Sequence, residues 1–265
     1  MTAVFAFSHG SAPLLISIPH DGRYIPPEIA IGMTAVGHAI PDTDWDVIRL
    51  YAFAGALDAS VLTANYSRYV VDLNRSATDE TLYPGQFSTS VCPIASFSGE
   101  ALYLADKIPD DREKHRRIHA CWRPYHEKLA ASLAEIKARF GYALLWDAHS
   151  IPGKVPLLFP GRLPDLNIGT NGGRSCEATM ELAVAGVAEA SSYSSVVNGR
   201  FKGGYITRHY GKPDDDVHAI QLELVQSCYM EEKPLRYDEA KAAKLGDTIR
   251  QMLRAFMTSA EKIYA

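Results

Sequence analysis

Two histidines of the sequence come directly after apolar segments. The stretch LLISIPHDG (14–22) leads into His20, and YALLWDAHS (142–150) leads into Asp147 and His149. Short apolar runs with β-branched residues are typical of buried strands. In open α/β sheets, ligands bind beyond the carboxyl ends of the strands. We therefore expect His20 and His149 to lie close together at one edge of a sheet, as members of one site.

Two histidines and a carboxylate suit a hydrolytic metal site. Zinc hydrolases hold the metal with three His or carboxylate ligands and leave a fourth position for water. Asp147 can orient the imidazole of His149 from behind. The segment PDTDWDV (41–47) is also typical of a helix N-terminus, where Asp is favoured. The third ligand stays open among four acids: Asp21, Asp42, Asp44 and Asp46.

A further acid lies inside a predicted strand. In AIQLELVQ (219–226), Gln221 and Glu223 alternate with apolar residues, so one face of this strand is polar. A carboxylate is costly to bury without a partner. We predict that Glu223 is the general base for a water molecule at the metal; an ion pair with an arginine is the alternative. The run YVVDLNR (69–75) brings Asp72, Asn74 and Arg75 towards the same edge.

Other chemistries have weaker support in the sequence. His115 and His119 are spaced i, i+4, but HRRIH lacks the glutamate of HExxH and places arginines beside the metal. We interpret these two, and His126, as packing or solvated positions. The sequence contains no GxSxG elbow for a serine nucleophile, and no GxxxxGK[ST] or GxGxxG loop for a nucleotide.

The elements that must position these residues alternate along the chain. Helical patterns cover roughly 42–58, 111–140, 175–190 and 238–262, with Gly141 as a C-cap. Two long segments, 76–110 and 151–174, are predicted loops that form substrate walls. This order predicts one α/β domain over residues 1–265, with three layers: a mixed, mostly parallel central sheet flanked by helices. The predicted strands are 14–19, 60–66, 68–74, 142–148, 194–200 and 219–225.

Composition excludes several classes of partner. The 265 residues are 47% hydrophobic with a net charge of −4, which argues against nucleic acid or an anionic membrane as partner. Apolar runs are too short to span a bilayer, and the N-terminus lacks a basic region. Four scattered cysteines read as reduced thiols. We expect a cytoplasmic protein; its oligomeric state stays open.

Several longer motifs together resemble one known family, the N-formylglutamate amidohydrolases, also called N-formylglutamate deformylases. The resemblance covers about residues 13–240. It implies hydrolysis of N-formyl-L-glutamate, a small molecule, to L-glutamate and formate in histidine degradation. It also implies a fold similar to zinc-dependent exopeptidases of the carboxypeptidase and aspartoacylase type, with Zn²⁺ or another divalent metal as cofactor. The motifs are LLISIPHDG, PDTDWDVIRLY, YSRYVVDLNR, WRPYH, FGYALLWDAHSIP, LNIGTNGGRSC, VVNGRFKGGYITRHYG and HAIQLELVQSCYMEE.

The resemblance assigns roles to individual residues. It implies His20, Asp44 and His149 as metal ligands, Glu223 as the base, and the pair Asn74–Arg75 as the grip on a substrate carboxylate. The chain departs from the family's wider fold at position 23, where HxxE would place a carboxylate and Arg23 stands instead. Arginine forks match carboxylates, and Arg75 can also stabilise an oxyanion. Further candidates for substrate binding are Arg200, Arg208 and Asn171, with the backbone of Gly172 and Gly173.

Two rival functions remain open at this point. The nearer rival is another zinc-dependent amidohydrolase, either a deacylase of a different N-acyl amino acid or a carboxypeptidase-like amidase. The other is a non-catalytic binding protein for a dicarboxylic amino acid, which keeps the arginines without a working metal site. Turnover of N-formyl-L-glutamate distinguishes the deformylase from the first rival, which would act on another substrate. Ligand binding without turnover would identify the second rival.

Overall fold

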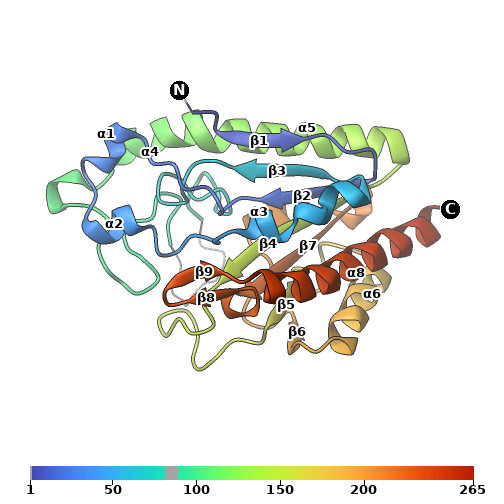
Figure 1. The fold of residues 1–265 in the computed structure, drawn as a ribbon. Helices are drawn as coiled ribbons and strands as arrows, with labels where there is room; N and C mark the ends of the chain where they lie inside the picture. Colours follow the sequence, from blue (N-terminus) through green and yellow to red (C-terminus); the bar gives the residue numbers. More distant parts are fainter. Residues whose placement is uncertain (1, 81–88) are drawn as a thin grey trace.

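A mixed, mostly parallel sheet forms the centre of the molecule (Figure 1). The computed structural model describes residues 2–80 and 89–265. Strands β3, β2, β4 and β7 run parallel, as do β5 and β6, whereas β1 pairs antiparallel with β3 and β5 with β7. In spatial order the strands are β1 (Phe5–Ser8), β3 (Ser60–Ala64), β2 (Leu14–Ile18), β4 (Ala143–Ile151), β7 (Val217–Val225), β5 (Leu166–Gly169) and β6 (Ser195–Val197).

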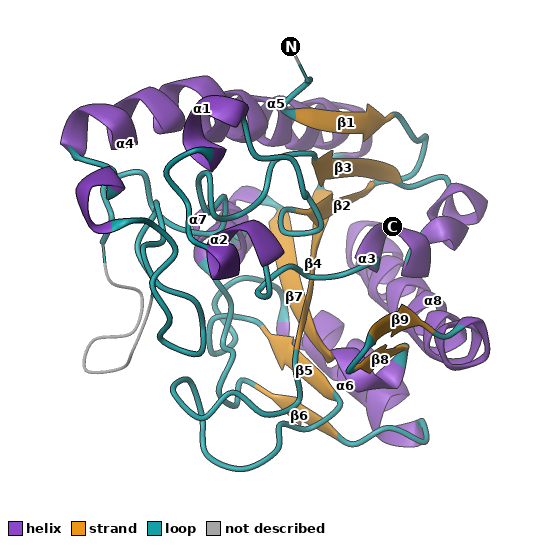
Figure 2. Cartoon of the chain, turned by 60° about the vertical axis from the view of Figure 1, so that its left-hand side comes forward, coloured by secondary structure: helices purple, strands orange, loops and turns teal. Residues whose placement is uncertain are grey.

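Helices cover both faces of this sheet, which confirms the predicted layers (Figures 1 and 2). Successive strand residues point to opposite faces. Leu15 and Leu145 share one apolar cluster with α5 (Arg123–Phe140), whereas Leu14 and Leu144 share the other with α8 (Glu239–Tyr264). Because neighbouring residues in each strand belong to different clusters, α5 and α8 lie on opposite faces. Helix α6 (Ala178–Ala190) packs beside α8.

Shorter elements complete the chain. They are α1 (Pro27–Ala30), α2 (Ala35–Ala39), α3 (Val47–Leu50), α7 (Tyr205–Tyr210), the hairpin β8 (Met230–Glu232) with β9 (Leu235–Tyr237), and the 3₁₀ turns Ala52–Leu57, Ala105–Lys107, Pro213–Asp215 and Gln226–Cys228. Two further features bear on the expectations from composition. Within the described residues, no helix has both the length and the apolarity that crossing a membrane requires. The four cysteines are free and buried.

The predicted helix over 111–140 is confirmed, with one local change. It consists of α4 (Asp111–Arg117), a π-helical turn (Ile118–Trp122) and α5, and it ends at Gly141 with φ +84°. Pro124 stands just after the π turn. A proline lacks the N–H of a helical hydrogen bond and crowds the carbonyl one turn before it, and a wider turn relieves both conflicts.

The predicted strand over 68–74 is wrong. Its apolar residues are buried, but its backbone forms turns, such as the bond from the Val70 N–H to the Ser67 carbonyl at 2.9 Å. A short apolar run does not distinguish a strand from another buried segment. Conversely, β5 lies inside the predicted loop 151–174, and β4 continues to Ile151 rather than ending at 148. Residues 81–88 of the predicted loop 76–110 lie outside the described residues.

Candidate active site

Strands β4 and β7 bring the polar residues of the site together. They pair in parallel, with His149 opposite Glu223 and Asp147 opposite Gln221, and all four side chains point to the face covered by α5. His20 follows two residues after the end of the neighbouring strand β2. His149 therefore lies within a strand rather than beyond its end, and the extended β4 fixes its position.

Three side-chain atoms from different elements surround one point. His20 Nδ1 and His149 Nδ1 are 3.1 Å apart, and Asp44 Oδ2 lies 3.1 Å from His149 Nδ1 and 3.6 Å from His20 Nδ1. All three residues are buried. Metal–ligand bonds of about 2.0–2.1 Å in a tetrahedron give ligand–ligand distances of about 3.3–3.4 Å. The three observed distances bracket that value, so these residues fit a divalent metal ion with a fourth position left open.

A carboxylate lies behind each of the two histidines, and the one behind His20 is hydrogen-bonded to its ring. His20 Nε2 lies 2.7 Å from Asp72 Oδ1. Because Asp72 is an acceptor there, Nε2 carries the proton and the lone pair of Nδ1 faces the metal position. His149 Nε2 lies 3.1 Å from Asp147 Oδ1 and 3.0 Å from the amide nitrogen of Asn74.

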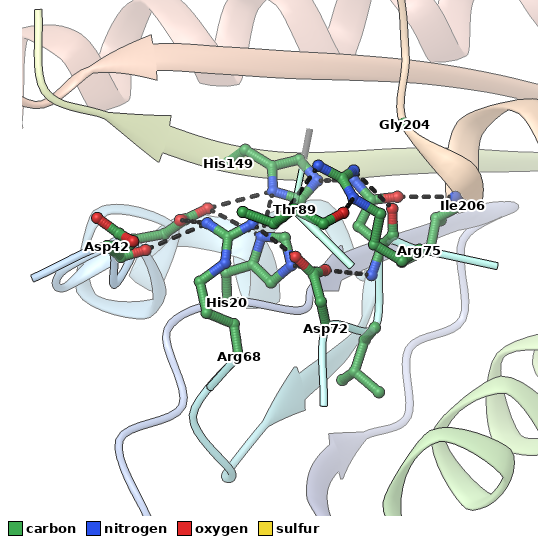
Figure 3. A network of polar contacts seen from close by, with 12 residues as sticks. His20, Asp42, Arg68, Asp72, Arg75, Thr89, His149, Gly204 and Ile206 are labelled. Carbon is green, nitrogen blue, oxygen red and sulfur yellow. Dashed lines mark hydrogen bonds and ion pairs between the residues drawn. The ribbon is translucent and has the colours of Figure 1, made fainter. Parts of the chain in front are cut away.

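The buried guanidinium of Arg68 connects these carboxylates. Its Nη2 donates to Asp72 Oδ2 at 3.0 Å, and its Nη1 lies 3.5 Å from Asp44 Oδ1. Figure 3 shows the side chains of His20, Arg68 and Asp72 gathered around this contact. Burial opposes ionisation of Asp44 and Asp72, but the attraction of His20 and Arg68 outweighs it and lowers the pKa of both carboxyls. Sequence reasoning missed Arg68, because no local pattern indicates that its side chain lies between two carboxylates from different segments.

The other three candidate acids have partners elsewhere. The Asp42 carboxylate accepts from the Tyr69 hydroxyl at 2.6 Å and the Phe97 N–H at 2.8 Å. Asp21 accepts from the backbone N–H groups at the start of α3, and Asp46 pairs with Arg23 at 2.8 Å. Of the four acids that the sequence leaves open, Asp44 is the one whose carboxylate lies with the two histidines.

A pocket opens over the histidines and Glu223. Burial raises the pKa of Glu223 to about 8. The predicted walls contribute Thr89 and Phe97 from the first long loop and Leu158 from the second. The lining comprises His20, Asp44, Arg68, Asn74, Arg75, Thr89, Phe97, His149, Ile151, Leu158, Arg200, Phe201, Gly204, Gln221 and Glu223.

The remaining predicted residues lie outside this lining. Arg208 Nε donates to the Gly203 carbonyl at 2.7 Å, and the Asn171 side-chain oxygen accepts from Arg174 at 3.1 Å. His115 and His119 are exposed on the long helix, whereas His126 is buried. The described part of the chain thus offers one His and carboxylate cluster suited to a metal, at the floor of a pocket with two arginines, Arg75 and Arg200, in its wall besides Arg68.

Comparisons with known proteins find relatives that match over nearly the whole chain. A family model described as N-formylglutamate amidohydrolase matches residues 12–230. The N-formylglutamate deformylase of Pseudomonas aeruginosa is 48% identical over 267 residues, covering 100% of both chains, and that of Pseudomonas putida is 47% identical over 259 residues, covering 97% of both. The crystal structure of N-formylglutamate amidohydrolase from Ralstonia eutropha JMP134 matches the fold with a TM-score of 0.81, at 22% identity and 98% coverage of both chains.

Proposed function

Because the chain belongs to the N-formylglutamate amidohydrolase family, we propose that it hydrolyses N-formyl-L-glutamate to L-glutamate and formate. The observation that carries the proposal is the placement of Glu223, a three-ligand metal position and arginine side chains around one pocket. Metal ligands with a neighbouring base suit attack of water on an amide, and arginines suit a substrate with two carboxylates.

We propose that His20, Asp44 and His149 hold a divalent metal ion, zinc first among the candidates, because two imidazoles and a carboxylate are typical zinc donors. When bound, such an ion acts as a Lewis acid and makes water a stronger nucleophile at neutral pH. The hydrogen bond to Asp72 keeps Nδ1 of His20 directed at the metal position, and the Asp147 carboxylate lies 3.1 Å from the other ring nitrogen of His149.

Glu223 transfers the proton in this mechanism. As a carboxylate it takes a proton from the water that attacks the formyl carbon, and it then delivers that proton to the nitrogen of the leaving glutamate. In the metal-free chain, burial raises the pKa of Glu223 to about 8. A cation held by the neighbouring ligands would lower that pKa and favour the carboxylate that takes the proton. The C–N bond breaks, and formic acid retains the attacking oxygen while the amine leaves neutral. Transfer of the proton of formic acid to the amine then gives formate and protonated glutamate.

The arginines account for the acidic substrate. We propose that Arg75 and Arg200, which line the pocket, bind the substrate carboxylates, with Asn74 as a further donor. Arg75 is held in place by Thr89, whose carbonyl accepts from Arg75 Nε at 2.9 Å. Arg208 and Asn171 stay predictions for substrate binding, and so does the place of the reaction in histidine degradation.

The direct test is release of glutamate by the purified protein from N-formyl-L-glutamate, before and after treatment with a chelator and after addition of zinc. We expect activity that the chelator abolishes and zinc restores. N-formyl-L-glutamine, which lacks one carboxylate, and N-acetyl-L-glutamate, which carries a larger acyl group, are the matched control substrates. Faster turnover of N-acetyl-L-glutamate would favour a different deacylase, and ligand binding without any turnover would favour a binding protein.

A further inference from the structure

The backbone that carries Asn74 and Arg75 lies outside every strand that the structure describes. Its carbonyl oxygens therefore need partners other than a sheet ladder. The Leu73 carbonyl lies 2.9 Å from His126 Nε2, and the Arg75 carbonyl accepts from Trp122 Nε1 at 2.9 Å. Between them, the Asn74 carbonyl receives the Tyr205 N–H at 3.4 Å. Two of these three partners are side chains of one sequence motif, WRPYH (122–126), to which the proposed mechanism gives no task.

The long helix places both side chains at the same spot. Trp122 and His126 are four residues apart, which brings them to one face of the helix. Their rings stack with centroids 3.8 Å apart and an interplanar angle of 24°. Trp122 ends the π-helical turn that precedes Pro124. The widened turn and the stacked rings thus direct two ring nitrogens towards residues 73–75.

The protonation of His126 is fixed by its surroundings. The side chain is 4% exposed, and burial lowers its pKa to about 3, so that the ring is neutral. A neutral imidazole has one N–H donor and one acceptor nitrogen. Because the Leu73 carbonyl only accepts, Nε2 carries the hydrogen. Nδ1 lies 2.9 Å from the Tyr210 hydroxyl, which also donates to the His126 carbonyl at 3.2 Å. His126 therefore acts as a fixed donor to the backbone next to Asn74.

These contacts reach the pocket through a short path. The Asn74 side chain places its amide nitrogen 3.0 Å from His149 Nε2 and accepts the Ile206 N–H at 2.8 Å. A Cβ on Gly204 would lie 2.3 Å from that same amide nitrogen, so Asn74 has little room to shift. A displacement of residues 73–75 would therefore move both Asn74 and Arg75 relative to the pocket.

We propose that Trp122 and His126 are positioning residues whose ring N–H groups hold residues 73–75 so that Asn74 and Arg75 face the substrate. This inference rests on the proposed function, because Asn74 and Arg75 bind substrate only there. It differs from a role in core packing, which needs the two rings but not their N–H donors. Substitutions that keep the ring or the donor therefore separate the two roles.

The test uses the zinc-loaded full-length chain with N-formyl-L-glutamate. Trp122→Phe keeps an aromatic ring and removes the donor; we expect KM to rise about tenfold or more, with a smaller fall in kcat. His126→Leu should act in the same direction, and His126→Gln, which restores an N–H donor, should recover part of the loss. Zinc content should stay near that of the wild type, and Tm should fall by about as much as in the control Tyr51→Phe, because each variant leaves one buried polar group unpaired. Tyr51→Phe, which removes the hydroxyl that accepts from Trp146 Nε1 at 2.7 Å in the cluster under α8, is the control.

A double-mutant cycle with Arg75→Lys checks the path. If Trp122 acts through the backbone of Arg75, Trp122→Phe should raise KM by a smaller factor in the Arg75→Lys background than in the wild type. The inference is overturned if Trp122→Phe raises KM by the same factor in both backgrounds, or if Tyr51→Phe raises KM as much as Trp122→Phe does. The inference is also overturned if the wild type is active and both Trp122→Phe and His126→Leu have the same KM as the wild type. A zinc-loaded wild type that releases no glutamate overturns the proposed function, and the positioning role with it.

Discussion

The two faces of strands β4 and β7 are buried to a similar degree, but they are stabilised in different ways. On the face under α8, the side chains are apolar and belong to one packed cluster. On the opposite face, after Leu145 and Ala219, which belong to the cluster with α5, they are polar or ionisable. The first set is Leu144, Trp146, Ala148, Ile220, Leu222 and Leu224, each 0% exposed; the second is Asp147 at 0%, His149 at 2%, Gln221 at 3% and Glu223 at 7%.

The difference follows from what burial demands of each kind of side chain. Apolar groups gain free energy from loss of water contact and need no specific partner. Buried polar groups need a partner for each donor and acceptor, and a cluster of buried charges often contributes little net stability. The polar face accordingly depends on distant segments, such as Asp44 and Thr207, whose hydroxyl donates to Asp147 Oδ2 at 3.1 Å. We expect one face to determine stability and the other activity.

The sharpest test of this comparison uses adjacent residues of β7. Glu223→Gln keeps the volume of the side chain and removes the base, so kcat/KM for N-formyl-L-glutamate should fall by about 10²–10⁴-fold. Its Tm should equal or exceed that of the wild type, because a buried carboxyl group no longer has to ionise. Steady-state kinetics and thermal unfolding check both statements. A variant that unfolds several degrees earlier would contradict the division between the faces.

Leu222→Ala tests the apolar face one residue away. Truncation of a fully buried leucine leaves a cavity and should lower the free energy of unfolding by about 2–5 kcal/mol. At low temperature, where the variant stays folded, kcat/KM should remain within a few-fold of the wild type. Urea unfolding and kinetics on the same preparation provide the measurement. A large loss of activity in the folded variant would show that packing on this face controls the site.

Metal binding should stabilise the protein through the polar face alone. With free zinc at about 100 times its Kd, binding to the folded state adds about 2.7 kcal/mol to the free energy of unfolding. We expect zinc to raise the Tm of the chelator-treated wild type and of Leu222→Ala, but not of His149→Ala. Calorimetry with and without zinc makes the comparison. An equal shift in His149→Ala would place the stabilising metal elsewhere.

A further test is the dependence of stability on pH in the metal-free protein. The pKa of Glu223 is raised to about 8 in the folded chain, above about 4.3 for a free glutamate. A carboxyl with a raised pKa contributes stability below its unfolded pKa, and that contribution is lost as pH rises through the folded pKa. The Tm of the wild type should therefore fall relative to Glu223→Gln between about pH 5 and pH 8. Leu222→Ala should follow the wild type, and parallel curves for all three would refute the assignment.

The sequence by itself predicted the class of fold, and it singled out His20, His149 and Glu223, which the structure brings together in the candidate site. Strands and helices alternate along the chain, and local patterns of hydrophobicity report such elements directly. The alternation of Gln221 and Glu223 with apolar residues already indicated a polar strand face, and the two histidines after apolar runs indicated where a site should form. Each of these signals lies within a single short segment, so no tertiary information was needed to read it.

Only the tertiary structure decided which distant residues complete the site. Asp44 and its three neighbouring acids look alike in sequence, and contacts with Tyr69, Arg23 and the start of α3 separate them. The run 68–74 has the composition of a strand, yet its Leu73 carbonyl lies against His126 Nε2 and its Tyr69 carbonyl accepts from the Tyr103 hydroxyl instead of from a neighbouring strand. The hydrophobic pattern determines that a segment is buried. The hydrogen-bond partners available to its backbone determine whether it becomes a strand or a series of turns.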